Sequence, residues 1–357
     1  MRILIDIGHP AHVHLFKNFA HLMIQKGSQV HFTVRDKEFE IALLEHEGFS
    51  YTNFGKHYKS KAGKIWGLVR FTINIVLVSI KFKPTIFLSH GSIYSALASF
   101  ILHKPNISLE DTGNREQVRI YLPFSQAVVT STSFPHNYGS KQIFYEGYHE
   151  LAYLHPRYFT PDKNIIGELG VKDNERYFIL RFVSWDATHD IGQGGVSYEM
   201  KKQLVDLLTR HGKLFISSET KLSAEFEAYR FHLPPEKMHH ALAFADLFVG
   251  EGVTMASECA VLGTPAVYVN SLQRGYTTEQ EKLYSLVYNF SNDKGVIEKV
   301  KELLESPELK TNCKISRDKM LTEKIDVTGF LVWFVETWPG SFKRSKENYE
   351  ETMKRFL

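Results

Sequence analysis

The sequence is 357 residues long, 43% hydrophobic and 23% charged, with a formal net charge of +3 at pH 7. This length exceeds one comfortable hydrophobic core and the composition excludes a disordered or fibrous chain, so we expect two folded domains. The small net charge argues against nucleic acid as a partner, since phosphate recognition needs a concentrated basic face. Two distant cysteines, Cys259 and Cys313, exclude a disulfide framework and favour a reducing, cytoplasmic location.

The first part of the chain alternates short apolar runs with amphipathic stretches. An apolar run already occupies residues 2–7, so we expect no signal peptide. The expected strands are residues 2–7, 29–34, a short segment near 51, 85–89, 106–109 and 126–130, and the expected helices are residues 12–25, 37–46 and 93–102. This β-α alternation predicts a parallel sheet covered by helices.

Residues 65–82 form the most apolar stretch of the chain. They include Arg70, Asn74 and Lys81, and the longest apolar run between these residues is too short to span a bilayer. We therefore expect a buried helix. Lysines at 56, 59, 61, 64, 81 and 83 surround the segment, which leaves a second interpretation, peripheral contact of residues 56–83 with the inner face of an anionic membrane.

The alternation stops over residues 145–162, which are rich in aromatic residues and proline, and it then restarts. The second set of expected strands is 176–182, 213–217, 247–250 and 266–270, with helices at 198–211 and 255–262. The pattern predicts an α/β protein of two doubly wound, Rossmann-like domains, residues 1–150 and 151–325. Residues 326–357 are expected to be helical and to pack back on the first domain.

The loops after the strands are where chemistry is expected, because open α/β sheets bind ligands at the carboxyl ends of their strands. The first such loop contains Gly8, which permits close backbone approach, followed by His9 and His12. A histidine at a helix start can act as a general base, and we assign this role to His12. The spacing of His9, His12 and His14 also permits a metal site. In the structural interpretation, His14 faces the core and His9 shapes the turn.

The second loop region combines residues 90–92 with the polar run 110–115. Glu110 and Asp111 are candidates for proton transfer, since carboxylates after a strand are costly unless they are solvated, paired or used. The alternative is a helix start in which Glu110 pairs with Arg115.

The third and fourth loops are expected to bind a nucleotide sugar. Polar residues with glycines follow the strand at 176–182 and suggest a diphosphate pocket, which Arg181, Ser184, Thr188 and His189 would line. Glycines then precede the helix at 255–262, whose start would present amides to phosphate and a carboxylate to ribose hydroxyls. The candidate residues there are Gly252, Val253, Thr254, Met255, Ser257 and Glu258.

Residues 252–258, together with Gly263-Thr264-Pro265, resemble the donor-binding segment of GT-B enzymes. The most similar forms are the N-acetylglucosaminyltransferase that completes the lipid-linked peptidoglycan precursor and the non-hydrolysing UDP-N-acetylglucosamine 2-epimerases. The resemblance implies two domains facing a central cleft, a uridine nucleotide, and Glu258 at its ribose. His12 falls where the transferase carries its glycine-loop histidine, although the two glycines that precede that histidine are absent here.

The epimerase resemblance is incomplete. The segment from His90 to Arg115 is similar in spacing, but Ser92 stands where epimerases place a catalytic aspartate. Residues 181–192 differ from the His-Arg-Arg-Glu-Asn motif of the epimerases, and His189 is a candidate to substitute in that motif. Over nearly its whole length the chain resembles a family of bacterial and archaeal proteins of unknown function, placed among GT-B enzymes, through residues 6–17, 181–190 and 250–265.

Three hypotheses follow. The first is a metal-independent glycosyltransferase without a cofactor, which moves a sugar from a nucleotide donor to a sugar or lipid-linked acceptor in surface polysaccharide or glycolipid synthesis. The second is a 2-epimerase that uses Glu110, Asp111 and His189. The third is a nucleotide-sugar-binding protein without catalysis. A metallohydrolase built on His9, His12 and His14 ranks behind these.

Overall fold

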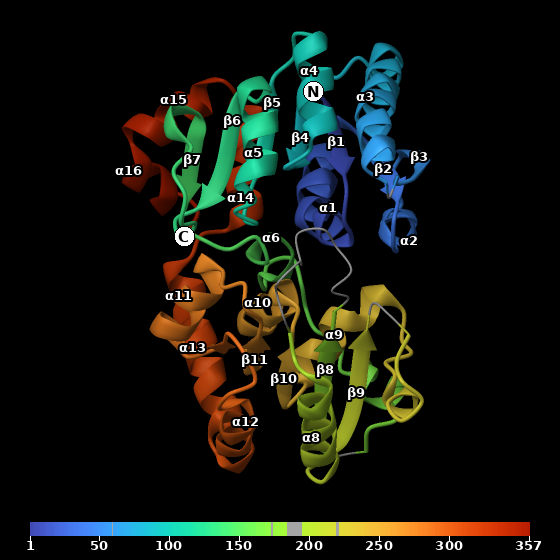
Figure 1. Cartoon of the computed structure of the whole chain (residues 1–357). Helices are drawn as coiled ribbons and strands as arrows, with labels where there is room; N and C mark the ends of the chain where they lie inside the picture. The colour runs from blue at the N-terminus through green and yellow to red at the C-terminus, as the bar shows by residue number, and fades with distance from the viewer. Residues whose placement is uncertain (59, 173, 184–194, 219–220) are drawn as a thin grey trace. The chain divides into compact units, whose positions relative to one another are not determined.

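The computed structural model describes residues 1–58, 60–172, 174–183, 195–218 and 221–357. The chain forms two compact units, one made of Met1–Tyr153 with Lys324–Leu357 and the other of Leu154–Glu323. Each unit contains one parallel sheet covered by helices (Figure 1). The α/β class predicted from the alternating pattern is therefore confirmed.

The first unit is built on a seven-stranded sheet in the order β3-β2-β1-β4-β5-β6-β7. Its strands are β1 (Arg2–Ile7), β2 (Gln29–Asp36), β3 (Tyr51–Lys56), β4 (Ile86–His90), β5 (Asn106–Leu109), β6 (Ala127–Ser131) and β7 (Gln142–Tyr145). In register, Ile5 lies between Phe32 on β2 and Leu88 on β4. The winding of the chain reverses between β1 and β4, so the loops after these two strands diverge at the edge where such sheets bind ligands.

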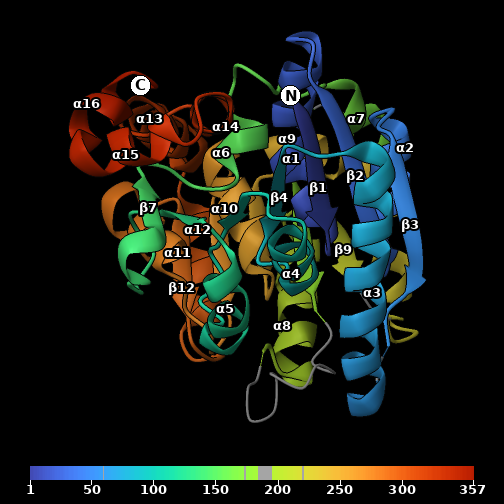
Figure 2. The ribbon, with the colours of Figure 1, turned by 90° about the horizontal axis from the view of Figure 1, so that it is seen from above.

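Helices of the first unit cover both faces of this sheet. They are α1 (Pro10–Gln25), α2 (Glu40–His46), α3 (Lys61–Phe82), α4 (Ile93–Ile101) and α5 (Arg115–Tyr121). α3, α4 and α5 pack in a row, and Figure 2 shows α3 beside α4. α1 begins two residues earlier than expected, because Pro10 suits a first helical position and His9 Nδ1 accepts a hydrogen bond from Ala11 N at 3.2 Å.

The C-terminal helices belong to the first unit. They are α14 (Val327–Glu336), α15 (Gly340–Glu347) and α16 (Tyr349–Lys354). Asp326 caps α14 by accepting a hydrogen bond from Gly329 N, and Thr328 Oγ1 donates one to the Ala152 carbonyl at 2.7 Å. α14 also packs against α1.

The expectation that residues 65–82 form a buried helix was wrong. They lie in α3, and only 28% of an 18-residue apolar window within Gly63–Phe82 is buried. Phe71 and Ile75 enter the core, whereas Ile73 and Leu77 are exposed. By length and composition α3 is a helix that could cross a membrane. Apolar composition marked the helix, but its burial depends on which of its faces has a partner.

The second unit contains a five-stranded parallel sheet in the order β12-β11-β10-β8-β9. Its strands are β8 (Tyr177–Phe182), β9 (Lys213–Ser218), β10 (Leu247–Gly250), β11 (Ala266–Val269) and β12 (Val287–Phe290). Its helices include α8 (Tyr198–Thr209), α9 (Met238–Phe244), α10 (Val253–Leu262), α11 (Gly275–Tyr284), α12 (Val296–Glu305) and α13 (Leu309–Glu323). Here the winding reverses between β8 and β10, so the loops after these strands are the corresponding ligand-binding position.

Candidate functional site

The loop between β1 and α1 brings a histidine to the carboxyl edge of the first sheet. Gly8 N donates a hydrogen bond to His12 Nδ1 at 3.3 Å. Because the neutral imidazole has one donor and one acceptor, this bond leaves the proton of His12 on Nε2. Burial, followed by the nearby His90 and His9, holds the pKa of His12 well below its usual value. His12 is therefore a neutral hydrogen-bond donor at Nε2, which differs from the general-base role expected for it.

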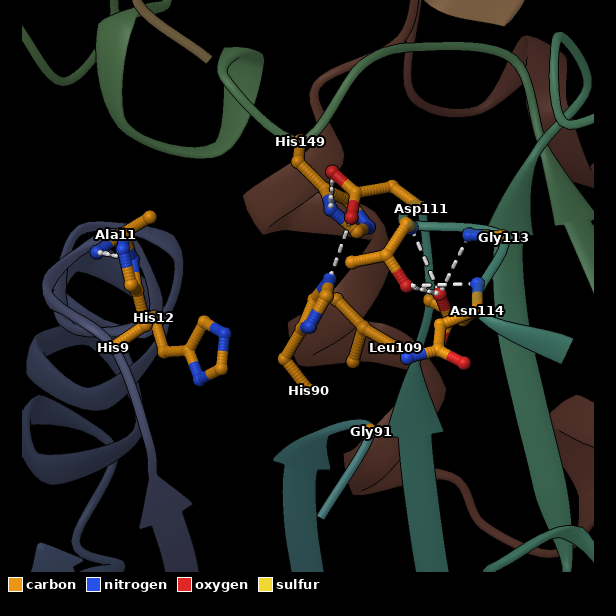
Figure 3. Close-up of polar contacts among 12 residues, drawn as sticks. His9, Ala11, His12, His90, Gly91, Leu109, Asp111, Gly113, Asn114 and His149 are labelled. Carbon is orange, nitrogen blue, oxygen red and sulfur yellow. Dashed lines mark hydrogen bonds and ion pairs between the residues drawn. The ribbon is translucent and has the colours of Figure 1, made fainter. Parts of the chain in front are cut away.

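A second group of side chains meets at the ends of β4, β5 and β7. His90 Nε2 lies 2.9 Å from Asp111 Oδ1, and His149 Nδ1 lies 3.1 Å from Asp111 Oδ2. His12 joins this group from α1, with its ring centroid 4.6 Å from that of His90. Figure 3 shows His12 and His90 facing one another, with Asp111 and His149 beyond His90.

The electrostatics of this cluster fix its charges. Burial alone would raise the pKa of Asp111, but His149 and His90 lower it well below its usual value. Burial alone would lower the pKa of His90, but Asp111 raises it above that of a free imidazole. The carboxylate thus stays ionised and makes His90 the more basic of the two facing imidazoles.

The cluster borders a cavity of about 440 Å³ within the first unit. Its lining includes Gly8, His12, Arg35, His57, His90 and Tyr94. Burial, followed by Arg35 and Lys37, lowers the pKa of His57 to about 4, so His57 is neutral near pH 7. The cavity thus offers neutral imidazoles and one basic imidazole around a space that can hold a sugar.

A buried ion pair lies beside the cavity, and one of its members, Arg35, lines it. Arg35 Nη1 donates to Asp6 Oδ1 at 2.6 Å, and the same carboxylate accepts hydrogen bonds from Thr33 and Ser92. Arg35 Nη2 also donates to the Ile7 carbonyl at 2.7 Å. Asp6 and Arg35 are both almost fully buried, so their charges compensate one another inside the fold. This pair fixes the end of β1, which leads into the loop and helix that carry His12.

His90, Asp111 and His149 could also hold a metal ion, because one ligand atom from each lies within 4.8 Å of the others. However, the two imidazoles approach different oxygens of Asp111, as when a carboxylate accepts one hydrogen bond from each.

His9, His12 and His14 do not form a group of possible metal ligands among the described residues. His9 caps α1, and His14 is buried with its ring stacked on Tyr153. The metallohydrolase hypothesis therefore loses the convergence of histidines that it requires.

Glu110 has a structural role, which corrects the expectation that it transfers protons. It is 1% exposed. One carboxylate oxygen accepts hydrogen bonds from Thr112 N, Thr112 Oγ1 and Gly113 N, and the other accepts one from the Tyr121 hydroxyl. These four donors occupy both oxygens and fix the turn before α5, whose cap is Asn114. The helix-start interpretation was right, but with these donors in place of Arg115.

In the second unit, the start of α10 is accessible and its next turn is buried. Gly252, Val253, Thr254 and Met255 are partly exposed, so the first amides of α10 can meet a ligand. Ser257 is fully buried and accepts a hydrogen bond from Gln280 Nε2 at 2.8 Å, which corrects its expected contact with a diphosphate. Glu258 is 4% exposed, and its Oε1 lies 2.9 Å from Nε2 of the buried His239.

Glu251 is a residue of this site that the sequence did not single out. Its carboxylate accepts hydrogen bonds from Val183 N at 2.9 Å and Val196 N at 2.8 Å, although it is 1% exposed. It thereby holds both ends of the loop after β8. Ser184, Thr188 and His189 of that loop lie outside the described residues.

Arg181 lies near the carboxyl end of β8, close to the start of this loop. Its Nη1 donates to Ser217 Oγ at 2.8 Å. A Cβ on Gly250 would lie 2.8 Å from the Arg181 carbonyl oxygen, so only glycine allows β10 to approach β8 this closely. The loops after β8 and β10 therefore start side by side.

Residues 1–320 match the family described as protein of unknown function (DUF354), and the chain belongs to it. No curated protein matches the chain. Among solved structures, the chain is similar to S. aureus MnaA in its structure with UDP, with a TM-score of 0.71, 11% identity, and 95% of this chain and 97% of that one covered. It is also similar to the Neisseria meningitidis UDP-GlcNAc 2-epimerase bound to UDP-GlcNAc, with a TM-score of 0.65, 13% identity, and coverage of 90% and 100%.

A Streptomyces glycosyltransferase is similar as well, with a TM-score of 0.60, 11% identity, and coverage of 94% and 100%. At these identities the likeness shows the fold alone. Both this transferase and the Neisseria meningitidis epimerase share it with this chain, so the fold is GT-B, as the sequence resemblance implied.

Proposed function

We propose that the protein is a glycosyltransferase that moves a sugar from a nucleotide donor, most simply a UDP-sugar, to a hydroxyl of an acceptor. The observation that carries this proposal is the pairing of His90 with Asp111 at the rim of a cavity of about 440 Å³. A basic imidazole held by a carboxylate at the edge of a sugar-sized space can activate a hydroxyl. The acceptor would belong to surface polysaccharide or glycolipid synthesis.

In this reaction the acceptor occupies the cavity and His90 accepts the proton of its hydroxyl. The acceptor oxygen forms a bond to the anomeric carbon of the sugar as the bond from that carbon to the nucleotide diphosphate breaks. His12 donates a hydrogen bond from Nε2 to an oxygen of the bound sugar or acceptor. Asp111 keeps its charge and stabilises the imidazolium that forms on His90.

The donor's diphosphate is assigned to the start of α10. Amides at a helix N-terminus favour phosphate, and Gly252 to Met255 are accessible there. This placement supports leaving-group stabilisation by the protein without a metal ion. Glu258, oriented by His239, is the candidate partner of the ribose hydroxyls.

The 2-epimerase hypothesis is less well supported. It uses Glu110, Asp111 and His189 for proton transfer and elimination, and both oxygens of the Glu110 carboxylate are engaged in fixing the turn before α5. Ser92 is also engaged, since it donates to Asp6 and caps α4.

The experiment combines binding with product analysis. Calorimetric titration with UDP and GDP identifies the nucleotide, and Glu258→Gln is expected to weaken its binding while the exposed Glu305→Gln does not. UDP-sugars are then incubated with an acceptor panel, and the products are identified by mass spectrometry. Transfer is expected to fall by about 10²–10⁴-fold in His90→Gln, with nucleotide binding intact. The control is His46→Gln, an exposed histidine at the end of α2.

Other outcomes separate the alternatives. Inversion at C2 of the sugar without an acceptor would identify an epimerase. Nucleotide-sugar binding without turnover across the panel would identify a binding protein. Absence of nucleotide binding at millimolar concentration would remove all three.

A further inference from the structure

Helix α3 presents an apolar face that the described residues of the first unit leave exposed. Six side chains on it are between 48% and 70% exposed, namely Ile65, Trp66, Val69, Ile73, Leu77 and Ile80. With 3.6 residues per turn, they fall within an arc of about 120°. The face is therefore one continuous stripe along the helix.

The opposite face of α3 is fixed in the core. Phe71 and Ile75 pack with Leu4 of β1 and Phe87 of β4. Although α3 is long enough to cross a bilayer, it could span one only by pulling these side chains out of the first unit. A helix with one face in a protein core and the other apolar face exposed is suited to lie in the plane of a membrane interface.

The helices that pack beside α3 expose further apolar side chains. α3, α4 and α5 pack in a row, and Phe100, Ile101 and Ile120 are 56%, 54% and 49% exposed on the latter two. We call these three residues and the six on α3 the apolar patch. Exposed apolar surface of this extent marks an interaction site.

The charges around the apolar patch select its partner. Residues 48–109 contain eight lysines and arginines and no aspartate or glutamate. Lys64, Lys81, Lys83 and Lys104, at the ends of α3 and α4, are exposed. Two copies of the chain joined through the patch would bring these like charges together, whereas anionic lipid headgroups would neutralise them.

We propose that the apolar patch docks the first unit on an anionic membrane surface. The apolar side chains enter the boundary between headgroups and acyl chains, Trp66 sits at headgroup level, and the lysines contact lipid phosphates. Ile120 belongs both to the patch and to the lining of the cavity. An acceptor anchored in the same membrane would thus lie beside the cavity, a consequence that rests on the proposed function. Docking itself is measurable whether or not the protein transfers a sugar.

The test is co-sedimentation of the full chain with vesicles. One set contains phosphatidylcholine alone, and the other contains equal parts of phosphatidylcholine and phosphatidylglycerol. The chain is expected to bind the anionic vesicles, less tightly as salt rises, and to bind the neutral ones about tenfold or more weakly. Ile73→Glu/Leu77→Glu is expected to abolish binding, and Lys81→Glu/Lys83→Glu to weaken it by about thirtyfold or more.

The matched control is Leu283→Glu/Ile315→Glu, which changes two apolar residues of the second unit that are 53% and 63% exposed. It should bind like the unchanged chain. Circular dichroism verifies that every variant is folded. Absence of binding to anionic vesicles, or binding that survives Ile73→Glu/Leu77→Glu, would overturn the proposal. A dimer in gel filtration that Ile73→Glu/Leu77→Glu converts to monomer, without vesicle binding by either protein, would assign the patch to a second copy of the chain.

Discussion

His90 Nε2 lies 2.9 Å from Asp111 Oδ1, so one hydrogen bond joins the carboxyl ends of β4 and β5 beside the cavity. Because Asp111 raises the pKa of His90, this imidazole keeps its proton to higher pH than a free histidine. A base of this kind is active only after it has lost the proton. Activity should therefore rise as pH passes the raised pKa of His90.

Asp111→Asn removes the charge that raises the pKa of His90. We expect the pKa of His90 to fall in this variant, and the acidic limb of the pH–rate profile to move to lower pH. Titration of the His90 Cε1 proton by NMR measures the shift independently of any substrate. The resonance is assigned with His90→Gln. An unchanged titration of His90 would show that Asp111 does not set its basicity.

The buried pair of Asp6 and Arg35 is expected to matter for stability. Arg35→Met leaves the Asp6 carboxylate buried without its cation, which should lower the free energy of unfolding by about 3–5 kcal/mol. Lys343→Met, which breaks an exposed pair with Glu347, should cost at most about 1 kcal/mol. Urea unfolding followed by circular dichroism measures both. The double variant Asp6→Leu/Arg35→Met should recover part of the loss, and a double variant less stable than Arg35→Met would contradict the charge argument.

The lowered pKa of His57 predicts how the stability of the fold depends on pH. Its pKa in the folded protein is lowered to about 4, whereas an unfolded chain has the usual value near 6.5. Between these values the unfolded state binds more protons than the folded state, so acidification from pH 7 toward pH 4 removes stability. His57→Gln should lose less stability over this interval. The shift of the urea midpoint between pH 7 and pH 5 tests this, and equal shifts in the unchanged chain and the variant would refute it.

The local pattern of the chain predicted most of the strands, because parallel strands covered on both faces are short apolar runs. β5 and β10 have the expected bounds, and β1 matches residues 2–7. Among the missed elements are β7, β12 and α5. β7 and α5 adjoin stretches whose polar or aromatic residues were taken for loops. These elements are short, and their pairing with neighbours decides them more than their own composition does.

The candidate site was predicted only where its residues follow a strand directly. Gly8, His12 and Asp111 were found in this way. His149 was missed because it lies in the aromatic stretch over which the alternation of strands and helices stops. Arg35 was missed because its partner Asp6 lies 29 positions away, and nothing local to either residue indicates the pair.

The arrangement of His90, Asp111 and His149 favours hydrogen bonding over metal binding. A bound divalent ion would compete with the hydrogen bonds that the two imidazoles make with different oxygens of Asp111. We therefore expect purified protein to contain no stoichiometric zinc, iron or manganese by plasma mass spectrometry, and sugar transfer to survive chelation. His149→Asn keeps a donor to Asp111 and should preserve part of the activity, whereas a metal centre would lose its ligand. Stoichiometric metal that disappears in His149→Asn, together with activity lost on chelation and restored by that metal, would make His90 a metal ligand in place of a base.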